Sequence, residues 1–386
     1  MRVFISAGEA SGDALGAALL EELIKKIPTT KSFGMGGPRM RALGFETFRD
    51  SKSLGVVGLF EVLRHLPRLF RLKDELADHA IEQKPDIAIL IDVPDFNIRL
   101  AKRLKKVGIP VIFYVGPSVW AWRPGRAKKY ARYIDSLLVL FPFELPIWRK
   151  FPIDVTCVGH PLVDEIRQTE HQPDQSPRTI ALLPGSRNSE IRRHLPTLLA
   201  TAKKLREQSV VERFVLPVAP TISPKMLKQE IRNYELLEAV ELIQSEAGNL
   251  KPKRAAIRQS LVALVASGTA TLEVALLGVP QVVVYRVHWL TWFLMRPLVK
   301  LNYLSLVNLI GEKEIVPELL QKRFTVENLT KKARALLVSE SERHNMSRQS
   351  QSIRTKLGAN GAAARAADAV VKLYEKLSTV ESHADS

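Results

Sequence analysis

Apolar residues recur along this chain in two alternating spacings. Short unbroken aliphatic runs, such as Ile87–Ile91 and Leu137–Leu140, are typical of strands that are buried on both faces of a parallel sheet. Longer stretches such as Ala14–Lys26 place apolar residues every three or four positions, which indicates one buried face of a helix. Strands that alternate with helices in this way predict parallel sheets covered by helices.

The same alternation predicts further elements in both halves of the chain. The expected strands are Val3–Ala7, Asp86–Ile91, Val111–Val115, Thr179–Leu183, Arg213–Pro217, Leu261–Ala266 and Gln281–Tyr285. Helices are expected at Asn97–Lys106 and from about Ser189 to Arg206, and the pattern is helical again from about Glu340.

A polar stretch, Thr169–Pro177, interrupts the pattern, and the alternation restarts after it. We therefore expect an α/β protein of two Rossmann-like domains with parallel sheets and a cleft between them. The first domain would span residues 1–168 and the second residues 178–345, and residues 346–386 would form a helical tail that could pack back across the domains. In such a fold, ligands bind at the carboxyl ends of the strands, where loops meet helix N-termini.

Length and composition agree with two folded domains. The chain has 386 residues, of which 46% are hydrophobic and 25% charged, so it is long enough for two cores and too apolar to be disordered. Its one cysteine, Cys157, excludes an intramolecular disulfide, and a small buried residue is its simplest role. The residues after Met1 are typical of a strand rather than a leader peptide, and no apolar stretch is long enough to span a bilayer, so we expect a cytoplasmic protein.

The net charge of +17 indicates an anionic partner, either nucleic acid or a membrane surface. Clusters of basic residues accompany two strongly apolar segments, Val56–Lys73 and Val287–Leu306, rather than the aromatic platforms typical of nucleic-acid binding. We therefore expect an anionic membrane surface as the partner and no nucleic acid. Core helices with solvated basic faces are the alternative interpretation of both segments.

The first expected strand ends in a glycine-rich loop, Gly8–Gly16. Its spacing is not G-x-G-x-x-G, which argues against a standard dinucleotide fingerprint. Glu9 and Ser11 offer acceptors suited to sugar hydroxyls, so they are candidate substrate-binding residues. A tight turn in which Ser11 or Asp13 caps the following helix is the alternative, and Asp13 fits the role of a cap better.

Asp92 and Asp95 follow the expected strand that ends at Ile91. Asp92 lies at the carboxyl end of this strand, where apolar neighbours can shift its pKa, and a general base requires such a position. Asp95 precedes the next helix and is most simply its N-cap, although we keep it as a candidate substrate-binding residue. The pattern does not decide which of Asp92, Asp95 and Glu9 acts as the base.

In the second half, the loop Leu182–Arg187 lies between a strand and a helix with one apolar face. The N-terminus of such a helix offers free N–H groups to a diphosphate. Gly185 and Ser186 are therefore candidate ligands. Arg187 can neutralise the charge of a leaving diphosphate, which makes it a candidate catalytic residue. A turn with a surface arginine is the alternative.

Another loop repeats this arrangement of strand, glycine and helix. Ser267, Gly268 and Thr269 are candidate phosphate ligands, and Glu273 either binds the ribose hydroxyls of a nucleotide or complements the helix dipole. Tyr285, at the end of a further strand, is also a candidate substrate-binding residue. Neither glycine loop of this half has the P-loop pattern, and no Asp-x-Asp or His-Glu-x-x-His grouping requires a metal, so we expect no cofactor and no metal.

Along nearly its whole length, the chain resembles the lipid-A-disaccharide synthases, a family of bacterial glycosyltransferases. The resemblance depends on segments that occur in the family's order, namely Ala7–Asp13, Gly36–Met40, Ile91–Asn97, Pro117–Arg123, Leu182–Arg187, Ala266–Glu273 and Tyr303–Leu309. Such an ordered set is far more specific than any single loop.

The resemblance implies a GT-B fold, with an acceptor domain first and a nucleotide-sugar domain second. It implies an inverting transfer that joins UDP-2,3-diacylglucosamine to 2,3-diacylglucosamine 1-phosphate, without a metal and at the inner face of the inner membrane. The products would be the β-1',6-linked lipid A disaccharide 1-phosphate and UDP. It also implies that Asp92 is the base, that Glu9 and Ser11 belong to the substrate loop, and that Arg187 and Asn308 belong to the donor site.

Two alternatives stay open. Another UDP-sugar transferase or epimerase of the same fold would not need the two apolar-basic segments. A non-enzymatic membrane adaptor would leave Asp92 and the anion-binding helix starts without a purpose. Acyl-chain length, the extent of domain closure and the oligomeric state, including a homodimer, are not determined by the sequence.

Overall fold

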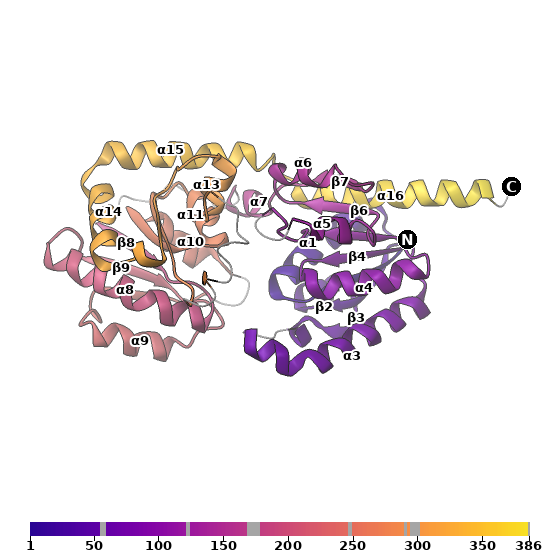
Figure 1. Ribbon diagram of the computed structural model, residues 1–386, viewed down its shortest axis with the longest axis horizontal. Helices are drawn as coiled ribbons and strands as arrows, with labels where there is room; N and C mark the ends of the chain where they lie inside the picture. Colours follow the sequence, from indigo (N-terminus) through magenta and orange to yellow (C-terminus); the bar gives the residue numbers. More distant parts are fainter. Residues whose placement is uncertain are drawn as a thin grey trace. The chain divides into compact units, whose positions relative to one another are not determined.

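The computed structural model describes residues 1–54, 59–120, 124–167, 178–245, 249–288, 292–293 and 302–384, with side chains for all of these except 52, 59–66 and 380–384. The chain divides into two compact units, each an α/β body (Figure 1). The first unit consists of Met1–Pro161 and Gly358–Ser386, and the second of Leu162–Leu357. The expected polar linker, Thr169–Pro177, lies outside the described residues.

In the described part of the first unit, seven parallel strands form one sheet in the order β3-β2-β1-β4-β5-β6-β7. The strands are β1 (Arg2–Ala7), β2 (Lys31–Gly36), β3 (Glu46–Asp50), β4 (Ile87–Ile91), β5 (Val111–Tyr114), β6 (Ser136–Val139) and β7 (Asp154–Cys157). The α-helices are α1 (Ala10–Lys26), α2 (Pro38–Arg41), α3 (Leu59–Gln83), α4 (Pro94–Lys106), α5 (Arg126–Tyr130), α6 (Leu145–Trp148) and α16 (Ala362–Ala384), and 3₁₀ turns occupy Ser51–Leu54 and Pro142–Glu144.

In the second unit, the described residues form a six-stranded parallel sheet in the order β10-β9-β8-β11-β12-β13. The strands are β8 (Thr179–Leu183), β9 (Arg213–Pro217), β10 (Val240–Ile243), β11 (Val262–Ala266), β12 (Gln281–Tyr285) and β13 (Glu318–Leu320). The α-helices are α7 (Leu162–Arg167), α8 (Asn188–Glu207), α9 (Pro224–Asn233), α10 (Lys251–Arg258), α11 (Thr269–Leu276), α13 (Leu306–Gly311), α14 (Val326–Val338) and α15 (Glu340–Lys356), with a 3₁₀ turn at Gln321–Arg323.

The strand order places a topological switch point in each unit. The chain adds strands on one side of the unit's first strand and then returns to the other side, so that β4 lies beside β1 and β11 lies beside β8. Open α/β sheets bind their ligands outside the carboxyl ends of the strands at such points. Most candidate site residues follow β1, β4, β8 and β11, whereas Tyr285 ends β12 and Asn308 lies in α13.

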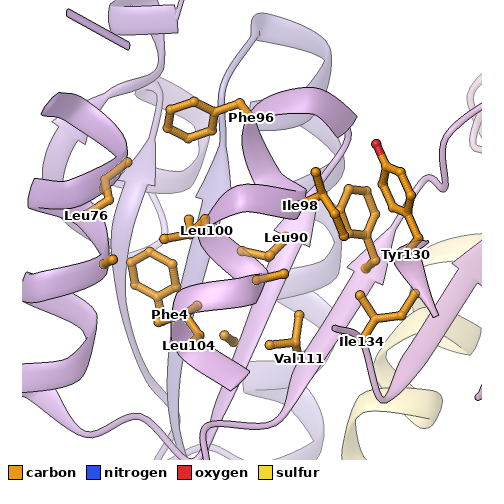
Figure 2. Close-up of a cluster of buried hydrophobic side chains, with 14 of the residues drawn as sticks. Phe4, Leu76, Leu90, Phe96, Ile98, Leu100, Leu104, Val111, Tyr130 and Ile134 are labelled. Atoms are coloured by element: carbon orange, nitrogen blue, oxygen red, sulfur yellow. The ribbon is translucent and has the colours of Figure 1, made fainter. Parts of the chain in front are cut away.

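Buried aliphatic and aromatic side chains hold the first sheet against its helices (Figure 2). Every residue of β4 is buried, as expected for a parallel strand that is covered on both faces. Leu100 and Leu104, one turn apart on α4, lie beside Phe4 of β1 and Leu90 of β4 in this cluster. Burying one such leucine stabilises the fold by about 1.5–3 kcal/mol, so α4 is firmly anchored to the strand that ends at Asp92.

The C-terminal helix α16 belongs to the first unit. It packs against α1, and its residues Ala366 and Ala367 are fully buried. Their small side chains let the two helices approach each other closely. The Arg365 guanidinium donates two hydrogen bonds to the carbonyl of Val158, at 2.9 and 2.7 Å, which fixes the start of the helix to the segment after β7. The last helix of the chain therefore belongs to the same compact unit as the first strand.

The predicted α/β fold class is confirmed, and the expected strands and helices are present with small differences at their ends. The helix expected from Ala14 begins at Ala10, because the first turn of a helix needs no intrahelical N–H partners and tolerates polar loop residues. The tail expected from residue 346 starts within α15, which stays with the second unit. The chain passes to the first unit at Gly358, whose φ of 94° suits glycine.

No helix in the described ranges is long and apolar enough to cross a membrane. Of the two apolar-basic segments, Val287–Leu306 lies largely outside the described residues. Within Val56–Lys73, side chains are described from Pro67 onward, and there Phe70 is exposed whereas Leu72 is buried. Part of this segment therefore faces the core and part faces solvent.

Candidate active site

Two loops meet at the carboxyl edge of the first sheet. The last residues of β1 and β4 pair with each other, so Gly8 and Asp92 leave the sheet side by side. A methyl group placed on Gly8 would clash with Leu54 and would lie 3.2 Å from Val93 Cγ2. Glycine therefore lets the loop after β1 lie close to the Leu54 side chain and to the turn at Val93.

Asp92 combines a strained backbone with a half-buried side chain. Its φ is 52° and that of Val93 is 42°, in the left-handed region that residues other than glycine rarely adopt. Such strain persists where the surrounding structure enforces it, commonly at functional sites. Burial raises the pKa of the Asp92 carboxyl, and a hydrogen bond from the Val93 backbone N–H offsets part of the rise. A raised pKa makes the carboxylate a stronger base than an exposed aspartate.

A buried asparagine on α4 holds the turn at Asp92. Asn97 Nδ2 donates to the carbonyls of Asp92 at 2.8 Å and Ile91 at 3.1 Å, and Asn97 Oδ1 accepts from Ser6 Oγ at 2.9 Å. Ser6 and Asn97 are both inaccessible to solvent, so losing either partner would leave buried polar groups unsatisfied. Sequence reasoning missed this pair, although an amide on the apolar face of the expected helix was a usable signal.

Glu9 and Ser11 lie at the start of α1, at the same edge as Asp92. Glu9 is the N-cap residue, and its exposed side chain makes no capping hydrogen bond. Ser11 is exposed in the first turn. The switch point between β1 and β4 therefore brings these two candidate substrate-binding residues to the edge of the sheet that carries Asp92.

Asp13 caps a different helix from the one that the sequence indicated. Its buried carboxylate accepts from the backbone N–H groups of Gly37 at 2.8 Å, Arg39 at 3.0 Å and Met40 at 3.2 Å, at the start of α2. The expectation that Asp13 caps its own helix is wrong, because α1 has already begun at Ala10. One side chain thus joins the first loop to the loop after β2.

Asp95 is not the N-cap of α4. The helix begins at Pro94, whose fixed φ suits the first helical position, and Val93 is the capping residue without a side-chain hydrogen bond. Asp95 therefore lies in the first turn, where a carboxylate still complements the helix dipole. Its exposed side chain forms an ion pair with Arg126 of α5. Its assignment as a substrate-binding residue stays a prediction.

In the second unit, the loop after β8 turns sharply into α8. Gly185 has a φ of 121°, and a side chain there would lie 2.7 Å from Glu190 Cβ. The Glu190 carboxylate accepts from the backbone N–H groups of Ser186 at 2.9 Å and Arg187 at 3.3 Å. A bound diphosphate would compete with Glu190 for these donors. The Arg187 guanidinium is exposed and lies 3.8 Å from Glu190, so it is accessible to an anion.

The loop after β11 leaves the start of α11 open. Gly268 has a φ of 154° and lies next to empty space, since an added Cβ would meet no atom within 4 Å. Thr269 is exposed beside it. Ser267 is half-buried, and its hydroxyl donates to the carbonyl of Leu304 at 3.3 Å. The backbone at this helix start is therefore accessible to a phosphate.

Glu273 is buried in α11 and paired with two cations. One carboxylate oxygen lies 3.1 Å from Arg254 Nε, and the other lies 2.6 Å from Lys253 Nζ. Arg254 is also buried and forms a second ion pair with Glu165 of α7. A ribose would have to share Glu273 with these cations, so the ribose-binding role of this residue stays a prediction.

Tyr285, at the end of β12, contacts a buried histidine of α8. The rings of Tyr285 and His194 lie 5.7 Å apart. His194 Nδ1 lies 2.8 Å from the Pro184 carbonyl and must donate to it, and Nε2 accepts from the Arg286 N–H at 3.1 Å. Burial lowers the pKa of His194, which favours this neutral ring. His194 thus joins the loops after β8 and β12, a role that no sequence motif marks.

Asn308 lies in α13, and its side-chain amide is fully used inside the unit. Its Oδ1 accepts from two backbone N–H groups at 2.8 and 2.9 Å, and its Nδ2 donates to a carbonyl and to Glu318 at 2.9 Å. Glu318 in turn accepts from the Leu304 N–H at 2.9 Å, and the Leu304 carbonyl accepts from Ser267. Asn308 thereby positions the segment that contacts the loop after β11.

The groups gathered at these loops suit oxygen-rich ligands. Backbone N–H groups, hydroxyls and an accessible guanidinium bind phosphate oxygens and sugar hydroxyls. In the ranges that the structure covers, no group of three or more His, Cys, Asp and Glu side chains is arranged to hold a metal ion. Of the segment Pro117–Arg123, residues 121–123 lie outside the described residues.

Comparison with known proteins identifies relatives along the whole chain. The family model described as lipid-A-disaccharide synthetase matches residues 3–372. A lipid-A-disaccharide synthase from Myxococcus xanthus (strain DK1622) is 38% identical over 380 residues, which cover 96% of this chain and 97% of that protein. A lipid-A-disaccharide synthase from Koribacter versatilis (strain Ellin345) is 40% identical over 389 residues, which cover 97% of this chain and 99% of that protein.

Solved structures with the same fold are more distant in sequence. The UDP-GlcNAc 2-epimerase from Neisseria meningitidis bound to UDP-GlcNAc has a TM-score of 0.66 at 14% identity and covers 96% of this chain and 100% of its own. MurG from Acinetobacter baumannii has a TM-score of 0.56 at 13% identity and covers 96% of this chain and 99% of its own. These likenesses identify the fold as the two-domain GT-B arrangement of glycosyltransferases and epimerases.

Proposed function

Because the chain belongs to the lipid-A-disaccharide synthetase family and is a glycosyltransferase that makes the lipid A disaccharide, we propose that it joins UDP-2,3-diacylglucosamine to 2,3-diacylglucosamine 1-phosphate with inversion. The products are the β-1',6-linked disaccharide 1-phosphate and UDP. The first unit binds the acceptor and the second unit binds the nucleotide sugar. Since both substrates carry acyl chains, the enzyme acts as a peripheral protein at the cytoplasmic face of the inner membrane.

In the proposed step, Asp92 takes the proton of the acceptor 6-hydroxyl while the hydroxyl oxygen attacks the anomeric carbon of the donor. The bond from this carbon to the β-phosphate oxygen breaks, and its electron pair leaves with UDP. The new bond forms opposite the leaving group, which inverts the configuration. Arg187 and the starts of α8 and α11 stabilise the charge that develops on the diphosphate.

The environment of Asp92 is the observation that carries this proposal. The carboxyl is half-buried at the switch point of the first sheet, and burial raises its pKa. Its turn is held in a strained conformation by Asn97. In the part of the chain that the structure describes, no cation pairs with Asp92; an ion pair would lower the pKa and weaken the base.

The second unit supports the donor role through its two helix starts. In this proposal, the N–H groups and hydroxyls of Gly185, Ser186, Ser267, Gly268 and Thr269 would bind the diphosphate once Glu190 releases its two donors. Glu273 and Tyr285 would then contact the nucleotide, and Asn308 would keep the loop after β11 in place.

The test is a discontinuous assay with both lipid substrates in neutral detergent micelles and EDTA present, in which UDP and disaccharide are quantified. Asp92→Asn and Arg187→Ala should each slow turnover by about a hundredfold or more. Asp95→Asn and Glu9→Gln are the matched carboxylate controls and should slow it much less than Asp92→Asn. Equal activity of Asp92→Asn and wild type would remove Asp92 as the base, and absence of disaccharide from wild type would reject this substrate pair.

The fold likeness to UDP-GlcNAc 2-epimerases raises a second reaction, although at 14% identity it supports the fold alone. Incubation with UDP-GlcNAc without an acceptor separates the two reactions, because an epimerase would produce the 2-epimer whereas a transferase would leave the sugar unchanged. We expect no epimer in the NMR spectrum of the mixture.

A further inference from the structure

A basic groove of about 390 Å³ runs along the outer side of α4 in the first unit. One wall is the middle of α3, and the other is α5 with the turn that follows it. The face of α4 that carries Leu100 and Leu104 is packed into the core (Figure 2), so the groove uses the opposite side of this helix. Six of its nine lining residues are basic, namely Lys73, Arg99, Lys102, Arg103, Lys106 and Lys129.

The positive charge of the groove is only partly neutralised within the protein. Lys73 and Arg103 form ion pairs with Asp74 at 2.7 and 2.9 Å, and Arg103 also pairs with Asp78 at 2.6 Å. The other four cations have no carboxylate partner among the described residues, and three of them lie on α4 within two turns of one another. Like charges at this spacing repel each other, so an anion in the groove would relieve the repulsion.

The groove also presents exposed aromatic surface. Phe70 of α3 is 40% exposed, and the Arg99 guanidinium lies over its ring at 4.7 Å. Lys102 Nζ lies 5.9 Å from the ring centre of Tyr133. Cations that flank partly exposed rings are typical of surfaces at a lipid interface, where the ring enters the headgroup layer and the cations contact phosphates. A nucleic acid would contact the same cations and could stack a base on Phe70, so the preference for a membrane surface rests on the lipid substrates of the proposed function.

We propose that this groove is the docking site for anionic phospholipid headgroups, which holds the first unit against the membrane. The inference rests on the proposed function in that the membrane carries both substrates. It goes further by assigning the attachment to α3, α4 and α5 and to phosphate recognition rather than to apolar insertion alone. Each Lys or Arg near an anionic bilayer contributes a factor of about five to binding, so neutralising three should weaken it roughly a hundredfold.

The experiment measures cosedimentation of the full-length protein with vesicles of phosphatidylcholine alone or with phosphatidylglycerol. The groove variant is Arg99→Gln, Lys102→Gln and Lys129→Gln. The control is Lys31→Gln, Lys84→Gln and Lys372→Gln, which removes the same charge from exposed positions of the same unit. We expect the groove variant to bind anionic vesicles about a hundredfold more weakly than wild type, and the control to stay within about threefold. Wild-type binding by the groove variant, or equal losses in both, would overturn the docking site.

Activity in neutral detergent micelles separates this inference from the proposed function. The groove variant should turn over dispersed substrates at the wild-type rate, because the docking site is not needed there. Loss of activity in the groove variant alone would mean that the groove binds a substrate phosphate. RNA binding of the same proteins is measured in parallel, and its loss in the groove variant with unchanged vesicle binding would assign the groove to nucleic acid. Either result overturns the proposal. If wild type makes no disaccharide but vesicle binding still depends on the groove, the docking site stands and the proposed reaction falls.

Discussion

Burial raises the pKa of Asp92 because the carboxylate loses water, and the hydrogen bond from the Val93 N–H offsets only part of this rise. The left-handed backbone at Asp92 and Val93 adds strain of the kind that costs about 1–3 kcal/mol per residue. Both costs fall on the residue that we propose as the base. At the scale of single residues, therefore, stability and activity should oppose each other at this position.

Asp92→Asn tests this opposition directly. Asparagine tolerates the left-handed region as aspartate does but carries no charge to desolvate, so we expect the free energy of unfolding at neutral pH to rise by about 1 kcal/mol while turnover falls. Because the folded pKa is raised, the carboxyl costs stability as pH rises through the window between its ordinary value and the raised one. Urea unfolding of wild type and variant at pH 3.5 and 7.5 should therefore show the gain only at the higher pH. A destabilised variant at pH 7.5 would contradict this account.

The same raised pKa predicts the pH dependence of catalysis. A base acts when deprotonated, so kcat/KM should fall as pH decreases through a pKa above that of an ordinary aspartate. Asp95→Asn should keep this acid limb, whereas the residual activity of Asp92→Asn should lack it. An unchanged limb in the residual rate of Asp92→Asn would assign the titration to another group.

His194 gives the second unit an opposite dependence on pH. Burial lowers its pKa in the folded state, so below the ordinary histidine value the unfolded chain takes up a proton more readily. Stability of this unit should be intact above about pH 6.5 and should decrease as pH falls towards the lowered pKa. His194→Gln should lose stability at pH 8 by about 1–3 kcal/mol but show a shallower further loss at pH 5.5. The measurement is thermal unfolding of wild type and His194→Gln across this pH range, with the transition of the second unit identified by its shift on addition of UDP. Parallel plots of stability against pH for the two proteins would argue against this role.

At the scale of elements, helix starts carry most of the candidate chemistry. α1, α4, α8 and α11 each begin after a short loop that follows β1, β4, β8 and β11, respectively. Side chains within two of these helices also hold neighbouring loops. Asp13 of α1 caps α2, and Glu190 of α8 accepts from the backbone N–H groups of the loop that precedes its own helix. Capping therefore fixes the loops as well as the helices.

Asp13→Ala should leave three buried or part-buried N–H groups of the α2 loop without a partner. We expect a loss of about 2–4 kcal/mol in the free energy of unfolding of the first unit. Asp95→Ala is the matched control, since its exposed ion pair should contribute no more than about 1 kcal/mol. Both are measured by urea titration, and losses of similar size would refute the capping role of Asp13.

At the scale of the whole molecule, sequence order and spatial grouping differ. The first unit is completed by residues after Gly358, so the first and last elements of the chain fold together through α1 and α16. α15 remains with the second unit, where it contacts α11, α13 and α14. Truncation from the C-terminus should therefore affect the unit that is most distant in sequence.

Deleting the residues from Gly358 onward should destabilise the first unit by several kcal/mol, because it exposes the face of α1 that buries Ala366, Ala367 and Val370. The second unit should keep its thermal transition and any shift of that transition by UDP. Deleting residues 379–386 removes none of these buried contacts and serves as the control. Both truncations are compared with wild type by calorimetry. If the longer truncation lowered only the transition of the second unit, this grouping of the elements would be contradicted.

Local pattern was sufficient for much of this structure. A parallel strand buried on both faces must be an aliphatic run, so the sequence located the strands and, by position, the loops that follow them. It also located Asp92 at a strand end and Arg187 at a helix start, because these places depend on residues adjacent in sequence. The order of its motifs was enough to indicate the family.

The partners of these residues depend on contacts across the fold. Asp13 caps a helix that starts 25 residues later (38 − 13), and His194 joins two loops that are far apart in sequence. The Asp92 turn depends on Ser6 of another strand through Asn97. Hydrogen bonding and burial act between neighbours in space, and spacing along the chain reports only neighbours within one strand or helix. Local pattern therefore indicates where the chemistry can occur, whereas packing across the fold selects the side chains that hold those positions in place.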